Sequence, residues 1–500
     1  MSDNWISKPG DKFFRPKRIT RFHLRRVLGV PGLFSAAYGD VGSSIYYALG
    51  VVAMSALGMT PIVLLISGVI FLFTALTYAE GATMLPEAGG SGAFAYRAFN
   101  PWVSFVAGWV LMLDYIVTMS ISAFTAANYL GYFFPIIKEL QIGGVIGLNS
   151  VIGIVIIIAL AFINIQGVQA SSRLNVILVL VDLITQVTIA ILGVVLVINL
   201  PTLIHNIHWG VAPTLNQLIF GISISMVAYT GIETVSNLGS EARRPEKSIP
   251  RAVLLVFLAV IALYSLLSMT ALSAYPVHQL PDGSWVTNLT TQYLQDPIMG
   301  IANIMPVAIR PVLSFWVAFL AVTILVIATN AGMLGASRLA YFMGQRHQLP
   351  AAVSSVSKRA RVPLNAILIF SVIACILIAS GQITLLVDLY AFGAVLAYST
   401  AHLSIIALRI KEPNLPRPFK IPLNIKIKGR EIPVTAVLGG LATLATWFMV
   451  VYTHSIGRIV GFSWLAVGLI IFFIYQRRRR KQSQEQQIYH KDDREDKEVL

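Results

Sequence analysis

The sequence contains little charge and almost no cysteine, and these two shortages already exclude most classes of protein. Only 12% of its 500 residues are charged, against about 25% in ordinary soluble domains. The single cysteine, Cys375, cannot form an internal disulfide. No phosphate-binding loop or nucleophilic triad is recognisable, which leaves ATP-driven transport and covalent catalysis without support. With 56% hydrophobic residues, the chain is expected to be a membrane protein and not an enzyme.

Apolar runs of roughly 20 residues follow one another past Pro31, and this is the length that a helix needs to cross a hydrocarbon core of about 30 Å. We expect twelve membrane-spanning helices, at residues 33–57, 61–83, 101–127, 149–167, 174–200, 213–238, 251–275, 311–337, 364–380, 384–408, 433–453 and 457–476. The sequence therefore predicts an all-α polytopic membrane protein. Its membrane domain covers 33–478, between a basic cytoplasmic N-terminus at 1–32 and a polar, disordered cytoplasmic tail at 479–500.

The basic residues predict the orientation of these helices, because Lys and Arg accumulate in cytoplasmic loops. Placing the N-terminus inside the cell puts 34 of the 37 basic residues on the cytoplasmic side. Only Lys138, Arg310 and Arg458 remain outside. We therefore expect a multi-pass protein of the plasma membrane with both termini in the cytoplasm. The net charge of +15 then serves membrane topology and requires no nucleic acid partner.

The acidic residues lie where they are costly, inside the predicted spans. A carboxylate at that depth is a functional-site hypothesis by default. The five such residues are Asp40, Asp114, Asp182, Glu233 and Asp388. Glu80, at the inner end of the second span, is expected to have a structural or gating role. No Lys or Arg is predicted at comparable depth, so protons or bound cations have to neutralise the charge, which favours a cation or proton pathway.

Asp40 and Glu233 lie at predicted breaks in their helices. Glycine costs about 1 kcal/mol in a helix interior, and serine and threonine compete for backbone hydrogen bonds. The break residues are Gly39, Gly42, Ser43 and Ser44 in the first span and Gly231 in the sixth. Unwound backbone at membrane depth is tolerated where it is buried or lines a cavity. Two breaks five spans apart are typical of transporters built from inverted repeats, with the binding site between the broken helices.

Segments around the sixth span resemble a known family. Tyr229–Leu238, followed by Glu241–Ala252, is similar to the sixth-helix signature and following loop of the amino acid-polyamine-organocation (APC) superfamily. Pro86–Gly92, after the second span, resembles another of its motifs. The resemblance covers residues 33–476. It implies the five-plus-five inverted-repeat fold of the leucine-transporter type, with two further helices, and alternating access coupled to protons or sodium.

The first break differs from that of the amino acid permeases in this superfamily. Those permeases usually present a run of small residues whose backbone amides receive a substrate carboxylate, and Asp40 would repel one. Gly39–Tyr47 is instead similar to the opening of KUP-type potassium importers, especially their KimA-like branch. This resemblance implies that the cation ligands are Asp40, Tyr47, Asp114, Tyr115, Thr118, Ser122 and Thr230. Asp114, Thr118 and Ser122 are one helical turn apart and share a face.

Four more roles follow from position. Glu233 is the expected proton carrier, because like charges close together favour protonation of one partner. Asp182, Asp388 and Tyr390 are candidates for a second ion site or a gate. In many proton-coupled amino acid permeases a lysine stands in for a sodium ion where Asp182 lies, so Asp182 is either a sodium or proton site or a hydrogen-bonded helix contact. Asp388 and Tyr390 lie near the outer start of the tenth span. At that position they can belong either to a gate or to a solvated vestibule.

Three functions remain open at this stage. The leading interpretation is proton-coupled potassium uptake by alternating access. The alternative is a proton- or sodium-coupled amino acid or polyamine permease of the same fold, since a cationic substrate can use Asp40 directly. A nutrient sensor that binds without transport is the third. Apart from K⁺, Na⁺ or H⁺ as transported or coupling ions, no cofactor or metal is expected. The expected partners are the substrate and the lipid bilayer, and a homodimer is compatible with the sequence.

Overall fold

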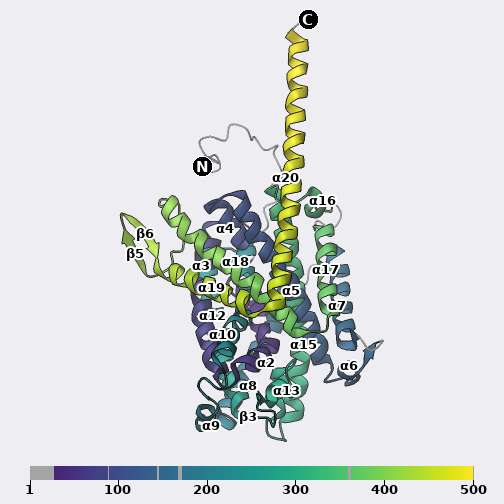
Figure 1. The fold of residues 1–500 in the computed structure, drawn as a ribbon, viewed down its shortest axis with the longest axis vertical. Coiled ribbons are helices and arrows are strands. Elements are labelled where there is room, and N and C mark those ends of the chain that lie inside the picture. Colours follow the sequence, from purple (N-terminus) through teal and green to yellow (C-terminus); the bar gives the residue numbers. More distant parts are fainter. Residues whose placement is uncertain (1–27, 88, 143–145, 167–171, 358–361, 499–500) are drawn as a thin grey trace.

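The protein is a bundle of long helices that run side by side along one axis (Figure 1). The computed structural model describes residues 28–498, except 88, 143–145, 167–171 and 358–361. Within these residues the strands form three separate two-stranded antiparallel hairpins, all between helices. The helices therefore make the core, and the strands belong to the connections.

The elements of the first half are α1 (Val30–Val41), η1 (Gly42–Ser44), α2 (Ile45–Ala56), η2 (Leu57–Met59), α3 (Thr60–Met84), α4 (Gly90–Ala98), α5 (Pro101–Leu130), α6 (Ile136–Glu139), β1 (Gln141–Ile142), β2 (Ile146–Gly147), α7 (Leu148–Ile165), α8 (Ser172–Leu196), α9 (Leu200–His205), α10 (Leu215–Ser225), η3 (Met226–Tyr229), α11 (Glu233–Asn237) and η4 (Gly239–Glu241), where η denotes a short 3₁₀ helix. Those of the second half are α12 (Pro245–Ala274), β3 (Val277–Gln279), β4 (Trp285–Thr287), α13 (Asn288–Gln292), α14 (Pro297–Asn303), α15 (Arg310–Gln345), α16 (Ala351–Ser354), α17 (Leu364–Ala379), α18 (Ile383–Lys411), β5 (Asn424–Ile427), β6 (Arg430–Pro433), α19 (Val434–Thr453) and α20 (Ser455–Glu498).

Ten helical stretches of the described residues are long and apolar enough to cross a membrane. The first of them, Val30–Met84, includes both the first and the second predicted span, and the backbone turns between them at Leu57, whose φ is 47°. Where the ninth span was expected, the structure has a shorter apolar helix, Leu364–Ala379. A polytopic helical membrane protein is thus confirmed at this level.

Helix α5 lies at the centre of the bundle. It packs against α15, α18, α4, α7 and α17, and its residues from Ser104 to Tyr129 are almost all buried. α20, by contrast, packs mainly along α5, α18 and α19 and leaves most of its apolar side chains exposed, as expected for the lipid-facing surface of a membrane helix. In contrast to α20, nearly all the polar side chains of α5 between Ser104 and Tyr129 are therefore enclosed by protein.

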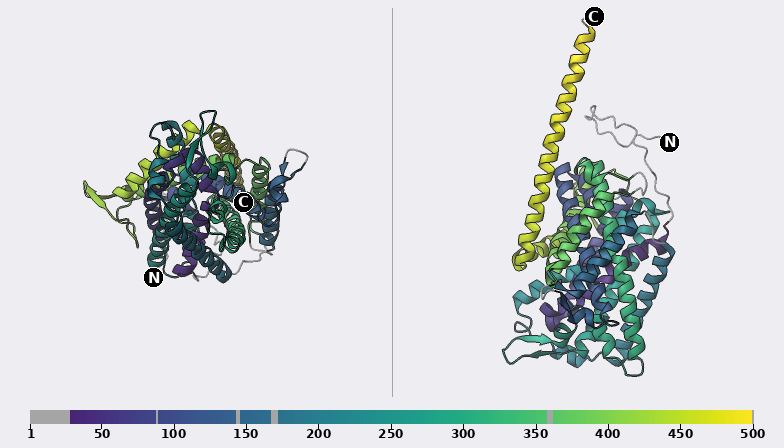
Figure 2. Two further views of the ribbon diagram at one scale, coloured as in Figure 1. Left: turned by 90° about the horizontal axis from the view of Figure 1, so that it is seen from below. Right: turned by 90° about the vertical axis from the view of Figure 1, so that its right-hand side faces the viewer.

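The two ends of the bundle differ in their elements (Figures 1 and 2). α4, α16 and the projecting part of α20 lie at one end, which we call the basic end because it carries most of the Lys and Arg residues of the described chain. α9, α13 and the β3–β4 hairpin lie at the opposite end, called the outer end below. The gathering of basic residues at one end agrees with the predicted concentration of Lys and Arg on one side of the membrane.

The tail at 479–500 differs from the predicted disorder, because α20 continues as a helix to Glu498. The physical reason is composition: after Gly468 the segment contains no glycine or proline, and it is rich in Arg, Lys, Gln and Glu, which are good helix formers. The expected N-terminal segment 1–32 lies largely outside the described residues.

Candidate functional site

Three buried carboxyl groups meet at the middle of the bundle. Asp40 comes from α1, Asp114 from α5 and Glu233 from the first residue of α11. Their exposed fractions are 3%, 1% and 1%, and the charges of Asp114 and Glu233, and of Asp40 and Glu233, interact directly. Three separate elements thus bring the acidic side chains together in a place closed to solvent.

The sixth predicted span is interrupted beside these carboxyls. η3 ends at Tyr229, Thr230 is extended (φ −81°, ψ 155°) and Gly231 has a φ of +113°, a conformation that side chains rarely permit. A Cβ at Gly231 would lie 2.8 Å from Cγ of Asp40. Glycine is therefore required here twice over, for the turn of the backbone and for the close approach of α1.

The first predicted break is narrower than expected. Gly39 lies within α1, and Gly42, Ser43 and Ser44 form a 3₁₀ turn that leads directly into α2, so the chain tightens instead of unwinding. The reason is packing: a Cβ on Gly42 would lie 2.7 Å from the ring of Tyr38. Gly42 thus makes room for the aromatic ring of Tyr38, four residues earlier. The helix does not unwind at this glycine.

The carboxyls have few hydrogen-bond donors. Thr234 Oγ1 donates to Asp40 Oδ2 (2.7 Å), while Asp40 Oδ1 has no donor among the described residues. Neither Oδ atom of Asp114 has an N–H or hydroxyl donor there; its partner is another carboxyl, Glu233, with which it shares a side-chain hydrogen bond through one proton. Glu233 Oε2 accepts from the Gly231 N–H (3.2 Å) and from Tyr398 Oη (3.1 Å). Three carboxyl oxygens are thus left for a proton or a positively charged ligand.

Hydroxyl groups surround the acidic cluster. Thr118 Oγ1 lies 2.7 Å from Tyr390 Oη and donates to the Asp114 carbonyl oxygen (2.9 Å). Tyr47 Oη is 2.9 Å from Ser44 Oγ, and Asn237 Nδ2 donates to Tyr115 Oη. Thr230, next to Gly231, donates to the Val227 carbonyl. Ser122 lies two turns beyond Asp114 on α5, and its buried hydroxyl has no partner in the described chain, where no hydrogen bond links it to the carboxyls. These groups present several hydrogen-bonding oxygens to the centre of the bundle.

The structure thus gathers most of the predicted site around one centre and adds residues that the sequence reasoning missed. Asp40, Asp114, Glu233 and their hydroxyl neighbours lie together, and Tyr390, expected at a gate, belongs to this group through Thr118. Thr234 and Tyr398, which hold Asp40 and Glu233, were not predicted. Thr234 directly follows Glu233, and this adjacency was the only signal for it. Nothing in the sequence singles out Tyr398.

Asp182 lies apart from this cluster. Its Oδ1 accepts a hydrogen bond from Tyr46 Oη (2.6 Å) and its Oδ2 from Gln186 Nε2 (2.8 Å). Tyr46 belongs to α2, so its bond joins α2 to α8, whereas the bond from Gln186 lies within α8. The geometry is that of the hydrogen-bonded helix contact, and an ion at Asp182 stays a prediction.

Asp388 is bound to an imidazole and not to the central group. His454 Nδ1 lies 2.7 Å from Asp388 Oδ1, and His454 Nε2 lies 3.1 Å from Ser223 Oγ. Phe220 stacks on the same imidazole, with ring centroids 4.1 Å apart. The contact ties α18 to α10 and to the junction of α19 and α20. A gate at Asp388 stays a prediction.

Glu80 forms a buried ion pair. Arg409 Nε and Nη2 donate to its two carboxylate oxygens, each at 2.7 Å, and the Ile421 N–H donates at 2.9 Å. The side chains of Arg409 and Glu80 are 2% and 0% exposed. Arg409, near the end of α18, is thus buried together with Glu80, near the end of α3. The expectation that no basic residue lies as deep as the five central carboxylates stays a prediction, because Glu80 is not one of them.

Ion pairs and backbone hydrogen bonds also join segments at the basic end. At the basic end, Arg338 Nη2 lies 3.2 Å from Glu241 Oε1, and Arg346 Nη2 lies 2.6 Å from Glu87 Oε2. Leu28 exchanges backbone hydrogen bonds with the segment that includes Glu241, at 2.9 to 3.0 Å. These contacts hold the basic end together, and the burial of the three carboxyls closes the central site to solvent in this conformation.

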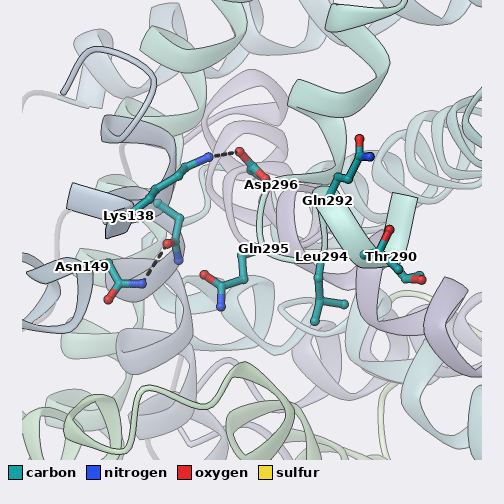
Figure 3. A pocket seen from close by; sticks show the side chains of 9 residues that line it. Lys138, Asn149, Thr290, Gln292, Leu294, Gln295 and Asp296 are labelled. Carbon is teal, nitrogen blue, oxygen red and sulfur yellow. Dashed lines mark hydrogen bonds and ion pairs between the residues drawn. The ribbon is translucent and has the colours of Figure 1, made fainter. Parts of the chain in front are cut away.

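The outer end holds a polar pocket of about 300 Å³ (Figure 3). Figure 3 shows Lys138 and Asp296 joined across it, close to Asn149 and Gln295. The Asp296 side chain is almost fully buried, and burial raises the pKa of its carboxyl above the ordinary value although Lys138 opposes the shift. The ion pair thus offsets only part of the free-energy cost of burying the Asp296 carboxylate.

This raised pKa predicts a pH dependence of stability. The folded protein holds the Asp296 proton more tightly than the unfolded chain, so this group contributes stability at low pH that is lost as pH rises through its raised pKa. Thermal unfolding of the purified protein between about pH 4 and 8 should therefore show a steeper loss with rising pH for the wild type than for Asp296→Asn. Exposed Glu139→Gln is the matched control. Parallel curves for wild type and Asp296→Asn would contradict the prediction.

Comparison with known proteins identifies the family. The family described as amino acid permease matches residues 28–475. The branched-chain amino acid permease BcaP of Bacillus subtilis is 25% identical over 461 residues, which cover 90% of this chain and 92% of that protein. The vacuolar cationic amino acid transporter 4 of Arabidopsis thaliana is 24% identical over 384 residues, 75% of this chain and 61% of that protein. The human cystine/glutamate transporter is 26% identical over 373 residues, 74% and 70% of the two chains.

These relatives confirm the resemblance to the APC permeases, and the resemblance to KUP-type potassium importers finds no support among them. They are transporters of the membrane and not enzymes, in agreement with the apolar helices and with the expectation from sequence. Because the match extends over nearly the whole described structure, this chain belongs to the amino acid permease family.

Proposed function

We propose that this permease is a secondary active transporter of cationic amino acids or amines, driven by a proton gradient. The observation that carries the proposal is the set of three carboxyl oxygens, on Asp40 and Asp114, that have no N–H or hydroxyl donor among the described residues. A buried carboxylate is tolerated when it is paired. An ammonium or guanidinium group of a substrate supplies both the positive charge and the hydrogen-bond donors that these oxygens lack.

The same geometry disfavours a substrate whose carboxylate binds at the first break. Asp40 lies in α1 against Gly231. A carboxyl group therefore already occupies the place where the first and sixth spans come close together. A second negative charge there would be repelled by Asp40 and, close by, by Glu233. The cationic end of a substrate is therefore the part that we place between α1, α5 and α11.

The relatives favour an organic substrate over a bare ion. Amino acids stand in the names of the branched-chain permease, the cationic amino acid transporter and the cystine/glutamate transporter. We therefore set the potassium interpretation behind the amino acid or amine one. Rubidium, which substitutes for potassium, is retained as an arm of the test.

The proposal includes the architecture. We take the two apolar parts of Val30–Met84 as separate spans and Leu364–Ala379 as a further one, which makes twelve with the remaining nine stretches. The 3₁₀ turn at Gly42–Ser44 and the interruption at Thr230–Ile232 would then be the corresponding breaks of a five-plus-five inverted repeat. The basic end faces the cytoplasm and the outer end faces the exterior of the plasma membrane.

Uptake into proteoliposomes tests the function. With a proton gradient directed inward, we expect saturable accumulation of radiolabelled arginine or putrescine, and background values for leucine and for radiolabelled rubidium. A parallel sodium gradient at constant pH should not drive accumulation. Leucine uptake that arginine does not inhibit would contradict a cationic substrate, and rubidium uptake would restore the potassium interpretation.

Glu233→Gln should separate coupling from binding. Glu233 lies beside Asp114 and accepts hydrogen bonds from Tyr398 and Gly231, so its proton can be exchanged while the surrounding contacts persist. We expect the variant to exchange internal for external substrate at a measurable rate but to lose accumulation driven by the proton gradient. Glu246→Gln, an exposed glutamate in the first turn of α12, is the control. Wild-type proton stoichiometry in Glu233→Gln would show that another group carries the proton.

A further inference from the structure

The β5–β6 hairpin stands away from the helix bundle. Figure 1 shows it projecting sideways from the end of α18, and the view along the bundle in Figure 2 shows the same lateral projection. Its strands are paired in regular antiparallel register, with Ile425 opposite Ile432 and Ile427 opposite Arg430. β6 packs on α18 and α19, while the tip of the hairpin points away from the helix bundle.

The hairpin carries both large apolar and basic side chains. In a strand alternate residues face opposite sides, so Ile425 and Ile427 of β5 share one face, with exposed fractions of 54% and 49%. Lys426 lies on the other face, opposite Glu431, and Arg430, the first residue of β6, is paired with Ile427. Leu423, just before β5 with a φ of 61°, is 70% exposed, and Lys428 lies in the turn. Three large apolar side chains and three cations therefore share a segment of eight residues (423–430). Such a surface fits a boundary between acyl chains and negatively charged headgroups.

Ion pairs connect this hairpin to the transport helices. Glu431 of β6 accepts from Lys420 at 3.1 Å and from Arg409 at 3.2 Å. Arg409 in turn holds Glu80 of α3 at 2.7 Å. α18, which carries Arg409, also carries Tyr398, the hydrogen-bond partner of Glu233. The orientation of the hairpin is therefore linked through side chains to the two helices that meet near the central site.

We propose that the β5–β6 hairpin binds anionic phospholipid of the leaflet at the basic end. The apolar side chains enter the acyl region, and the three cations pair with phosphate headgroups. The charge of the hairpin selects this occupant. Lys428 and Arg430 are exposed cations, and Lys426, although opposite Glu431, adds a third positive charge, whereas a neutral membrane would engage the apolar residues alone. β6 continues directly into α19, whose Leu438 and Leu441 are exposed to the lipid side of the bundle, so the apolar surface is continuous with the membrane-facing surface.

The insertion can be measured without reference to transport, because the chain has a single cysteine. In a Cys375→Ser background, Ile425→Cys is labelled with a nitroxide and the full-length protein is reconstituted into vesicles. One set contains phosphatidylcholine alone and the other an equal mixture with phosphatidylglycerol. We expect the label to become more accessible to oxygen and less accessible to a water-soluble nickel reagent in the anionic vesicles. High salt should weaken the difference.

Two charge variants make the test specific. Lys426→Gln/Lys428→Gln/Arg430→Gln should lose the dependence on phosphatidylglycerol and retain about a tenth or less of the bound anionic lipid counted by native mass spectrometry. The matched control removes three exposed basic residues elsewhere at the basic end, Arg244→Gln/Lys247→Gln/Arg251→Gln, and should keep the dependence.

Equal label accessibility in the two vesicle types would overturn the proposal. Insertion that depends on lipid but persists in the hairpin triple variant would overturn the role of its charges. Protection of the label that requires a soluble protein and not anionic lipid would assign the surface to a protein partner instead. None of these readouts needs substrate, so they stand independently of the proposed transport function.

Discussion

Asp40→Asn is expected to abolish accumulation of the cationic substrate while leaving the protein folded. The carboxyl of Asp40 is buried, one of its oxygens has no donor in the described chain, and the other is held by Thr234. An asparagine keeps the size and can still accept from Thr234, but it removes the negative charge that neutralises the substrate. Loss of one partner from a buried charge pair costs about 2–5 kcal/mol, which corresponds to a fall in substrate affinity of roughly 30-fold to several thousand-fold.

The measurement is uptake and substrate-dependent thermal stabilisation of the purified variant. The stabilisation assay reports binding even when transport has stopped, and the unfolding temperature without substrate reports folding. Asp282→Asn, in the exposed loop between β3 and β4, is the matched control and should behave as the wild type. Substrate-dependent stabilisation of Asp40→Asn equal to that of the wild type would place the cationic group elsewhere.

Arg409→Met is expected to have the largest effect on stability. It removes the bidentate partner of the buried Glu80, which keeps Arg417 Nε at 3.5 Å and the Ile421 N–H at 2.9 Å. Loss of one member of a buried ion pair costs about 3–5 kcal/mol, and Arg417 offsets part of that cost. Replacing both charges by apolar groups of similar volume is often neutral, so Glu80→Met/Arg409→Met should recover part of the loss, although it also takes the Glu80 carboxylate from Arg417. Unfolding of the detergent-solubilised variants, followed by heat or denaturant, measures the difference.

The half-exposed pair of Arg97 and Glu412, at 2.6 Å, supplies the control for this experiment. An ion pair in contact with water contributes about 0–1 kcal/mol, so Arg97→Met should change stability little. Two results would show that the buried pair is not the stabilising contact at the basic end. Arg409→Met would be no more destabilising than Arg97→Met, or the double variant would be less stable than either Glu80→Met or Arg409→Met.

The course of the chain through the membrane was predictable because it rests on a local property. A helix that crosses the hydrocarbon core needs a certain length of apolar residues, and this length can be read from the sequence without any knowledge of neighbours. The long helices α5, α12, α15 and α18 begin and end within several residues of their predicted bounds. The tail at 479–500 was expected to be disordered because its polar composition was weighed above its helix propensity, whereas α20 continues to Glu498.

The details of the broken helices depend on packing and were predicted only in part. Glycine and serine at 39–44 indicated an unwound segment, yet the structure keeps the chain helical there and uses Gly42 to admit the ring of Tyr38. At Gly231 the positive φ and the approach of Asp40 require the same residue. The sequence alone does not show whether a glycine is needed for a positive φ or for the close approach of a neighbouring side chain.

The sequence alone determined that this is a polytopic membrane protein with carboxylates inside its spans, because the cost of placing a charge in an apolar run depends only on the run itself. Only the tertiary structure decided which carboxylates belong together. Asp40, Asp114 and Glu233 share one centre, Asp182 is held by Tyr46 and Gln186, Asp388 by His454 and Glu80 by Arg409. These partners lie up to 329 residues apart in the chain. The packing of whole helices creates such contacts, so the local pattern of residues contains no trace of them.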